Sequence, residues 1–141
     1  MTGLKELQYK APTLLADRVA WGINDMKKVL VVDDEQSLLR LLAIRLRLSG
    51  YDVITAINGS EALELIENER PDLVLLDIIM PVVDGFEVLE IMRDWCTAPV
   101  IAMSAREENA DRAWELGARE FVSKPFDVDE LVGTIQRILA G

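Results

Sequence analysis

Histidine is absent from the 141 residues of this chain, and cysteine occurs once, as Cys96. Without histidine, a His-ligated zinc site, a histidine base and a phosphohistidine within the chain are excluded. A single cysteine cannot form an intramolecular disulfide, which fits a reducing compartment, and an inert buried thiol is its ordinary role. Basic residues are also few: the chain has 15 lysines and arginines against 25 aspartates and glutamates, which gives a net charge of −10. A positively charged surface for direct nucleic acid or anionic membrane binding is therefore not expected.

Long apolar runs are missing as well. No stretch approaches the roughly 20 residues that cross a bilayer, and the first residues lack the basic start and apolar core of a signal peptide. Hydrophobic residues nevertheless make up 50% of the chain, which is enough to build a folded core. The length suits one domain. We therefore expect a cytoplasmic protein with one core and no membrane contact.

From residue 28 onward, short apolar runs alternate with longer segments of helical spacing. The apolar runs cover residues 29–32, 53–56, 73–76, 100–103 and 121–123. The helical segments cover 36–48, 60–69, a stretch from Asp84 to before Pro99, a stretch over 110–117 and one that opens at Asp127. Five strand–helix repeats predict an α/β fold with a doubly wound, five-stranded parallel sheet. Right-handed crossovers favour a flavodoxin-like (βα)5 topology with strand order 2-1-3-4-5.

Residues 1–26 do not follow this alternation, and we separate them as an N-terminal extension from a domain over residues 27–141. Pro12 could begin a helix, and apolar residues recur at helical spacing from Leu14 to Met26. Two interpretations remain open. The segment is either an amphipathic extension that docks on a partner or a second protomer, or an upstream start with little function.

Charged side chains stand at the carboxyl ends of three predicted strands. Asp33 and Asp34 follow the first, Asp77 follows the third, and Lys124 follows the fifth. Because loops at the carboxyl ends of parallel strands converge on one crevice, these four groups are expected to meet there. Mg²⁺ prefers oxygen ligands, and together with Lys124 it would balance the three negative charges. A carboxylate in such a site can accept a phosphoryl group as an acyl phosphate.

Each of these residues also has a more ordinary interpretation. Asp33 and Asp34 could cap the first helix, and Asp77 could be a strand-end turn residue. Lys124 could be a solvated lysine, and Ser104, at the end of the fourth strand, could be a turn hydroxyl. Their shared position at carboxyl strand ends favours a functional site over five separate coincidences.

Taken together, the motifs make the sequence resemble the receiver domain of two-component response regulators. They read Val-Leu-Val-Val-Asp33-Asp34-Glu35, Leu-Leu-Asp77-Ile-Ile-Met80-Pro81, Asp84-Gly85, Met103-Ser104-Ala105 and Lys124-Pro125-Phe126. The resemblance extends over residues 27–140, and the combination of motifs is far more specific than any one of them.

The resemblance implies that Asp77 is the phosphoacceptor and that Mg²⁺ is the cofactor. Asp34 and Asp77 would bind the metal directly, with the backbone carbonyl of Ile79 as a third protein ligand. Asp33 would act through a metal-bound water.

The resemblance also assigns roles to residues of the last two strands. Lys124 would contact the phosphoryl group, and its bond to Pro125 is expected to be cis. Ser104 takes the position of the switch hydroxyl and Phe121 that of the switch aromatic. Phosphorylation would draw the hydroxyl toward the phosphate, and the aromatic ring would turn inward.

The implied function is a phosphoacceptor signalling switch and not an enzyme, with only self-phosphorylation and autodephosphorylation chemistry. A sensor histidine kinase or a histidine phosphotransfer protein would supply the phosphoryl group. The downstream effector stays unidentified and a homodimer stays open. The alternative is a receiver-fold interaction module that works without phosphorylation, against which the full acid set argues. An aspartyl phosphatase is disfavoured because Ile79 stands where that class usually carries a second acid.

Overall fold

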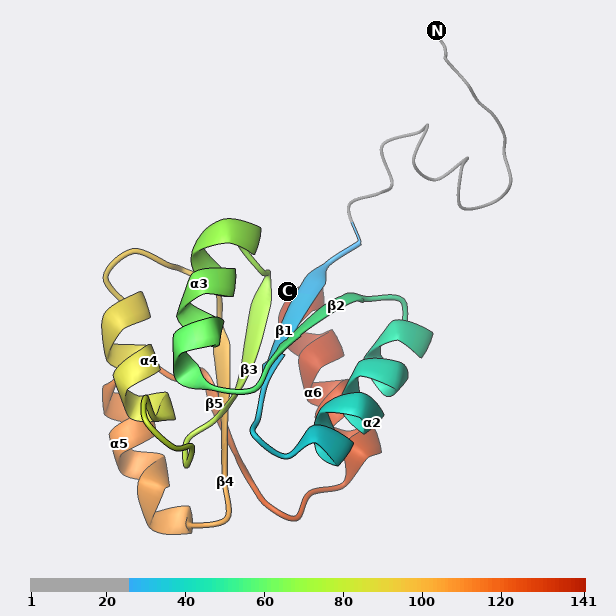
Figure 1. Cartoon of the computed structure of the whole chain (residues 1–141). Helices are drawn as coiled ribbons and strands as arrows, with labels where there is room; N and C mark the ends of the chain where they lie inside the picture. Colours follow the sequence, from blue (N-terminus) through green and yellow to red (C-terminus); the bar gives the residue numbers. More distant parts are fainter. Residues whose placement is uncertain (1–25) are drawn as a thin grey trace, which may run out of the picture.

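A computed structural model describes residues 26–141, and the first 25 residues lie outside it. The helix predicted within the N-terminal extension therefore stays a prediction. Strands and helices alternate through the described part of the chain (Figure 1). In chain order they are β1 Lys28–Val32, α2 Gln36–Leu48, β2 Asp52–Ala56, α3 Gly59–Glu69, β3 Leu73–Asp77, α4 Gly85–Met92, β4 Val100–Ser104, the 3₁₀ turn η1 Glu107–Asn109, α5 Ala110–Glu115, β5 Glu120–Ser123 and α6 Val128–Ala140.

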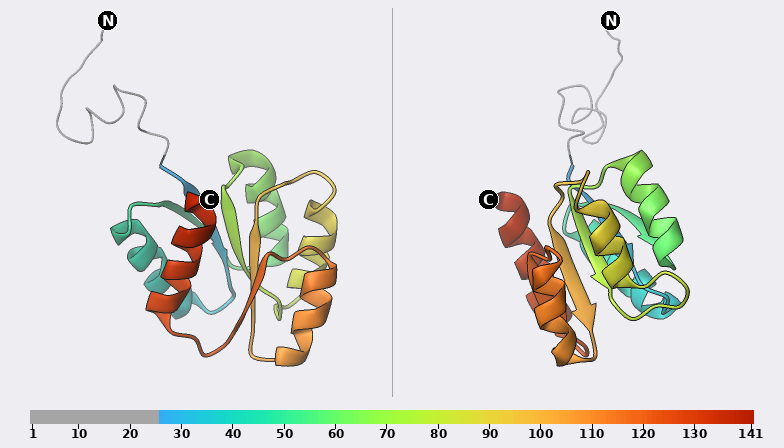
Figure 2. Two further views of the ribbon diagram at one scale, coloured as in Figure 1. Left: turned by 180° about the vertical axis from the view of Figure 1, so that it is seen from behind. Right: turned by 90° about the vertical axis from the view of Figure 1, so that its left-hand side faces the viewer.

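The five strands form one parallel sheet in the order β2-β1-β3-β4-β5, which confirms the predicted flavodoxin-like topology. Helices α2 and α6 cover one face, and α3, α4 and α5 cover the other (Figures 1 and 2). Strands β1, β3 and β4 lie between other strands and are almost wholly buried. Their continuous apolar runs follow from this position, because both faces of a doubly wound sheet are covered.

Side-chain caps set the starts of α4 and α6 where the sequence predicts them. At the start of α4, the Asp84 carboxylate accepts a hydrogen bond from the amide of Glu87, and the Glu87 side chain accepts one from the amide of Asp84. This reciprocal pair satisfies two amides that the first turn leaves without helical partners. Asp127 likewise accepts a hydrogen bond from the amide of Glu130 at the start of α6.

Two helices are shorter than their patterns predict. Helix α4 ends at Met92, because the amides of Trp95 and Cys96 both turn back to the Met92 carbonyl and close the helix. The chain then runs as a loop to Pro99, whose ring disfavours helical geometry in the residue before it. Helix α5 ends at Glu115, and Gly117 follows with a φ of +104°, a conformation that a side chain would strain. In the described part of the chain, none of the helices has the length and apolarity to span a membrane.

Candidate functional site

The three predicted carboxylates come together at the carboxyl edge of the sheet. Asp33 directly follows β1, and Asp77 is the last residue of the adjacent β3. Oxygen atoms of Asp33, Asp34 and Asp77 all lie within 4.8 Å of one another, a spacing that one metal ion can bridge. The sheet order produces this cluster, because β1 and β3 are neighbours although helix α2, strand β2 and helix α3 separate them in sequence.

Asp33 is fully buried, and both of its carboxylate oxygens are occupied. Oδ1 accepts a hydrogen bond from the amide of Glu35 at 2.9 Å, and Oδ2 accepts one from Lys124 Nζ at 2.7 Å. Asp33 does not cap helix α2. The N-cap residue of that helix is Glu35, and it makes no side-chain capping hydrogen bond. Asp33 instead ties the end of β1 to the lysine that follows β5.

Asp34 is exposed at the mouth of the crevice. Among the described residues, no hydrogen bond or ion pair to its carboxylate is found. Asp33 has its oxygens committed, whereas Asp34 has oxygens that remain open to a ligand. The expected direct ligation by Asp34 and water-mediated role of Asp33 stay predictions.

Asp77 is buried, with 4% of its surface exposed, and it lies in an unfavourable electrostatic environment. Burial, followed by the nearby charge of Asp33, raises the pKa of Asp77 to about 6, against opposing effects of Lys124 and the Ile79 amide. The Ile79 amide donates to Asp77 Oδ1 at 3.2 Å. Because burial is the main cause of this shift, a divalent cation held in the crevice would favour the ionised carboxylate and lower its pKa.

Lys124 is the cation that reaches both buried acids. Its Nζ is 2.7 Å from Asp33 Oδ2 and 3.5 Å from Asp77 Oδ2. Burial alone would lower the pKa of Lys124, but the hydrogen bond to Asp33 and the charges of Asp77 and Asp33 together raise it above the usual value. The lysine therefore stays protonated. The bond from Lys124 to Pro125 is cis, as expected.

Ser104 ends β4 as a fully buried hydroxyl. Its Oγ accepts hydrogen bonds from the amide of Arg106 and from Asn109 Nδ2, each at 3.0 Å. Because both bonds use the oxygen as acceptor, the hydroxyl proton is still available to a further acceptor. The sequence analysis missed Asn109, whose only signal was its place five residues after the predicted switch hydroxyl.

Phe121 lies on β5 at an intermediate exposure and packs against the core that α3, α4 and α5 cover. It pairs across the sheet with Ala102 of β4. This position is compatible with an ordinary core aromatic and with a ring that can move, so the switch role of Phe121 stays a prediction.

Gly85 holds the loop after β3 close to Asp77. A Cβ atom at Gly85 would lie 2.5 Å from the Asp77 carbonyl oxygen and 2.6 Å from the Ile78 Cα atom. The amide of Gly85 also donates to the Ile78 carbonyl at 2.8 Å. This close approach explains the Asp84-Gly85 motif, because only glycine allows α4 to begin directly against the site.

The fold agrees with comparisons to known proteins. A model of the response regulator receiver domain matches residues 29–136. The chain belongs to the response regulator receiver family. Over 116 residues it is 44% identical to the alkaline phosphatase synthesis transcriptional regulatory protein PhoP of Bacillus subtilis, covering 80% of this chain and 48% of that protein. The chain thus spans about half the length of the curated relatives it matches.

Solved receiver structures superpose on this one. The receiver domain of Francisella response regulator 1452 has a TM-score of 0.77 at 32% identity, covering 81% of this chain and 97% of that one. The CheX-CheY-BeF3-Mg²⁺ complex of Borrelia burgdorferi gives 0.74 at 32% identity, covering 80% and 89%. As a receiver domain, the chain has a signalling role, and its acidic crevice is of the kind in which this family typically binds Mg²⁺.

Proposed function

We propose that this receiver domain is a phosphoacceptor switch in which Asp77 takes a phosphoryl group from a histidine kinase or a histidine phosphotransfer protein. The observation that carries the proposal is the buried Asp77 carboxylate, with Asp33 and Asp34 beside it and Lys124 Nζ 3.5 Å from its Oδ2. An acid in this position is costly to keep ionised. A role in chemistry gives a reason for the chain to maintain it.

The residues of the crevice fit a bound Mg²⁺. The crevice offers carboxylate oxygens, the hard ligands that this ion prefers, and the charge of the ion would favour ionisation of the buried Asp77, whose pKa is raised mainly by burial. Asp34 and Asp77 would hold the ion together with the Ile79 carbonyl. When bound, Mg²⁺ supplies positive charge that stabilises the charge on the transferring phosphoryl oxygens.

In the transfer itself, a carboxylate oxygen of Asp77 attacks the phosphorus atom. The new O–P bond forms as the P–N bond to the donor histidine breaks, and the imidazole nitrogen leaves with the bonding electron pair. Lys124 remains protonated and can pair with the incoming phosphoryl oxygens, which requires its Nζ to share or leave Asp33. No proton transfer by the protein is needed for this step, which agrees with the absence of histidine.

The Ser104 hydroxyl would report the phosphorylated state to the rest of the domain. It now accepts from Arg106 and Asn109, and its proton is available to a phosphoryl oxygen. A shift of Ser104 toward the phosphate would open space beside β4 that the Phe121 ring could fill. The phosphate can drive this change only if it binds one arrangement better than the other.

Intact mass after incubation with acetyl phosphate and Mg²⁺ tests the proposal. Wild type should gain one phosphoryl group, Asp77→Asn should gain none, and Asp94→Asn, an exposed acid outside the crevice, should behave as wild type. An adduct that survives in Asp77→Asn would refute the assignment of Asp77. Absence of any adduct in wild type, with Mg²⁺ and from a cognate kinase, would favour the interaction module that works without phosphorylation.

Partners and location belong to the same proposal. A kinase or phosphotransfer protein would dock near the crevice in the cytoplasm, and the downstream effector would read the surface formed by α5, β5 and α6. Hydrogen exchange across β4, η1, α5 and β5, with and without beryllofluoride, would detect this change. Equal protection from exchange with and without beryllofluoride would show that phosphorylation does not change this surface.

A further inference from the structure

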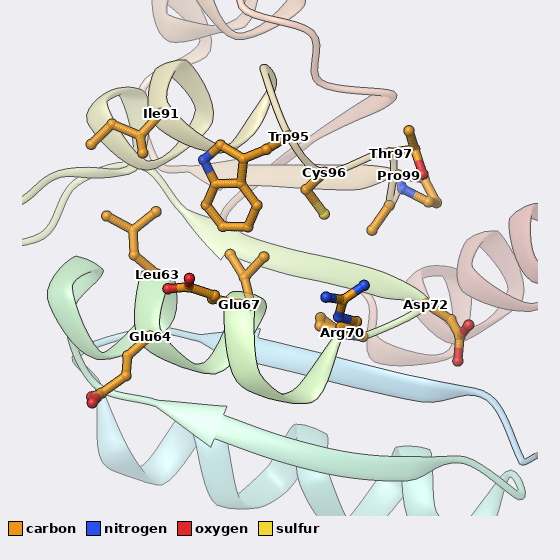
Figure 3. Close-up of a pocket in the computed structure, with 13 residues that line it drawn as sticks. Leu63, Glu64, Glu67, Arg70, Asp72, Ile91, Trp95, Cys96, Thr97 and Pro99 are labelled. Atoms are coloured by element: carbon orange, nitrogen blue, oxygen red, sulfur yellow. The ribbon is translucent and has the colours of Figure 1, made fainter.

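A groove lies between α3 and α4 at the edge of the sheet where the strands begin, opposite the acidic crevice (Figure 3). Its volume is about 980 Å³. The last turns of α3, the turn at 70–72 and the end of α4 form its walls, and the loop at 95–99 closes one side. No part of the phosphoacceptor site lines it.

The walls of the groove carry large exposed apolar side chains. Trp95 is 50% exposed and Ile91 is 47% exposed, and Leu63 lies beneath them at an intermediate exposure. Large apolar side chains that gather around one hollow mark an interaction site more often than scattered ones do. The lining is acidic on balance, because Glu64, Glu67 and Asp72 outnumber its one base, Arg70. The surface therefore fits a segment with an apolar face flanked by basic charge.

The start of the described chain lies at one end of this groove. The Lys28 amide donates to Asp72 Oδ2 at 2.7 Å, and Asp72 lines the groove. Lys28 Nζ also binds the Glu69 carboxylate at 2.9 Å, at the end of α3. The preceding residues must leave the fold from this point. The N-terminal extension is therefore attached beside the groove.

The sequence before Lys28 has apolar residues at helical spacing and a neighbouring basic residue, which matches this surface. Leu15, Val19, Ile23 and Met26 recur at intervals of three and four residues, and Arg18 stands beside them. A helix over residues 12–26 would be about 22 Å long, whereas the α3 wall from residue 63 to 70 spans about 11 Å by the same rise per residue. The segment is thus long enough to cover the groove from its point of attachment.

We propose that residues 12–26 of this chain dock in the α3–α4 groove through their apolar face, with Arg18 toward the acidic lining. Covalent attachment favours this occupant over a separate protein, because a short tether gives an effective concentration on the order of millimolar. Docking would cover Trp95 and Ile91. It would also fasten the N-terminal extension to the side of the domain away from the phosphoacceptor crevice.

Disulfide trapping in the full chain tests the proposal, because Cys96 lines the groove and is the sole cysteine. A second cysteine is introduced by Val19→Cys, or as a matched control by Asp17→Cys, which helical spacing puts on the opposite face. In a glutathione buffer, Val19→Cys should form an intramolecular disulfide with an effective concentration at least about tenfold above the millimolar value of a flexible tether. Asp17→Cys should not exceed that value.

Two trapping outcomes would overturn the proposal. Equal effective concentrations for Val19→Cys and Asp17→Cys would show that the segment is a flexible tether and does not dock through one face. Disulfide-linked dimers whose yield rises with protein concentration would show instead that a second copy fills the groove. Adding Cys96→Ser to each variant must abolish the intramolecular product, which checks that the groove thiol is the partner.

Alkylation of Cys96 by iodoacetamide provides a measurement that needs no new cysteine. If the segment covers the groove about nine-tenths of the time, Val19→Glu should react about tenfold faster than wild type. Asp17→Glu, which keeps the charge and changes the opposite face, should react at the wild-type rate. Equal rates in all three full-length proteins would overturn the proposal.

Discussion

Replacing Asp77, the proposed phosphoacceptor, with asparagine should stabilise the metal-free protein at neutral pH. The pKa of this carboxyl is raised from 3.8 to about 6, and the group is only 4% exposed. A carboxyl whose folded pKa lies above its unfolded pKa stabilises the protein below the unfolded value, and this stabilisation is lost as pH rises through the folded value. The shift corresponds to about 3 kcal/mol lost by about pH 7, since one pKa unit is about 1.4 kcal/mol.

Asparagine cannot ionise and keeps an oxygen for the Ile79 amide. The gain in unfolding free energy from Asp77→Asn should therefore be about 2 kcal/mol larger near pH 7 than near pH 4.5. Urea unfolding in EDTA at both pH values measures it. Asp94→Asn removes the same charge from an exposed site and should show no such pH dependence.

Magnesium provides the second half of this test. Saturating Mg²⁺ should reduce the advantage of Asp77→Asn, because the ion stabilises the native state to which it binds and the variant has lost a ligand. A gain that is the same at both pH values, or equal to that of Asp94→Asn, would refute the reasoning that burial and the charge of Asp33 strain this carboxylate.

Three further predictions follow from the geometry of the crevice. Asp34→Ala should weaken Mg²⁺ binding more than Asp33→Ala, as measured by titration calorimetry, and the reverse order would contradict the ligand assignment. Gly85→Ala should lower the free energy of unfolding in urea by roughly 2–4 kcal/mol, because the new Cβ would lie 2.5 and 2.6 Å from backbone atoms. A loss below about 1 kcal/mol would show that the loop can move to accommodate the methyl group. Asn109→Ala should cost about 1 kcal/mol, and this cost should largely vanish in a Ser104→Ala background if the hydrogen bond between them is its source.

Much of the site could be predicted from the sequence because the signals are local or topological. The placement of Asp33, Asp77 and Lys124 at carboxyl strand ends follows from apolar runs and the general rule for parallel sheets. The acidic cluster agrees with that expectation, and the cis Lys124–Pro125 bond agrees with what the family resemblance implies. The separate roles of Ser104 and Phe121 in a switch were implied by family resemblance and await a measurement.

The sequence by itself determined the order and type of the elements, since the period of two or 3.6 residues and the capping residues act within a few positions of the chain. Only the tertiary structure decided that Lys124 lies closer to Asp33 than to Asp77, and that Asn109 holds the Ser104 hydroxyl. It also decided that a groove opens between α3 and α4. These features depend on distances between side chains far apart in sequence. Such distances are set by how helices pack on the sheet, for which no local pattern carries information.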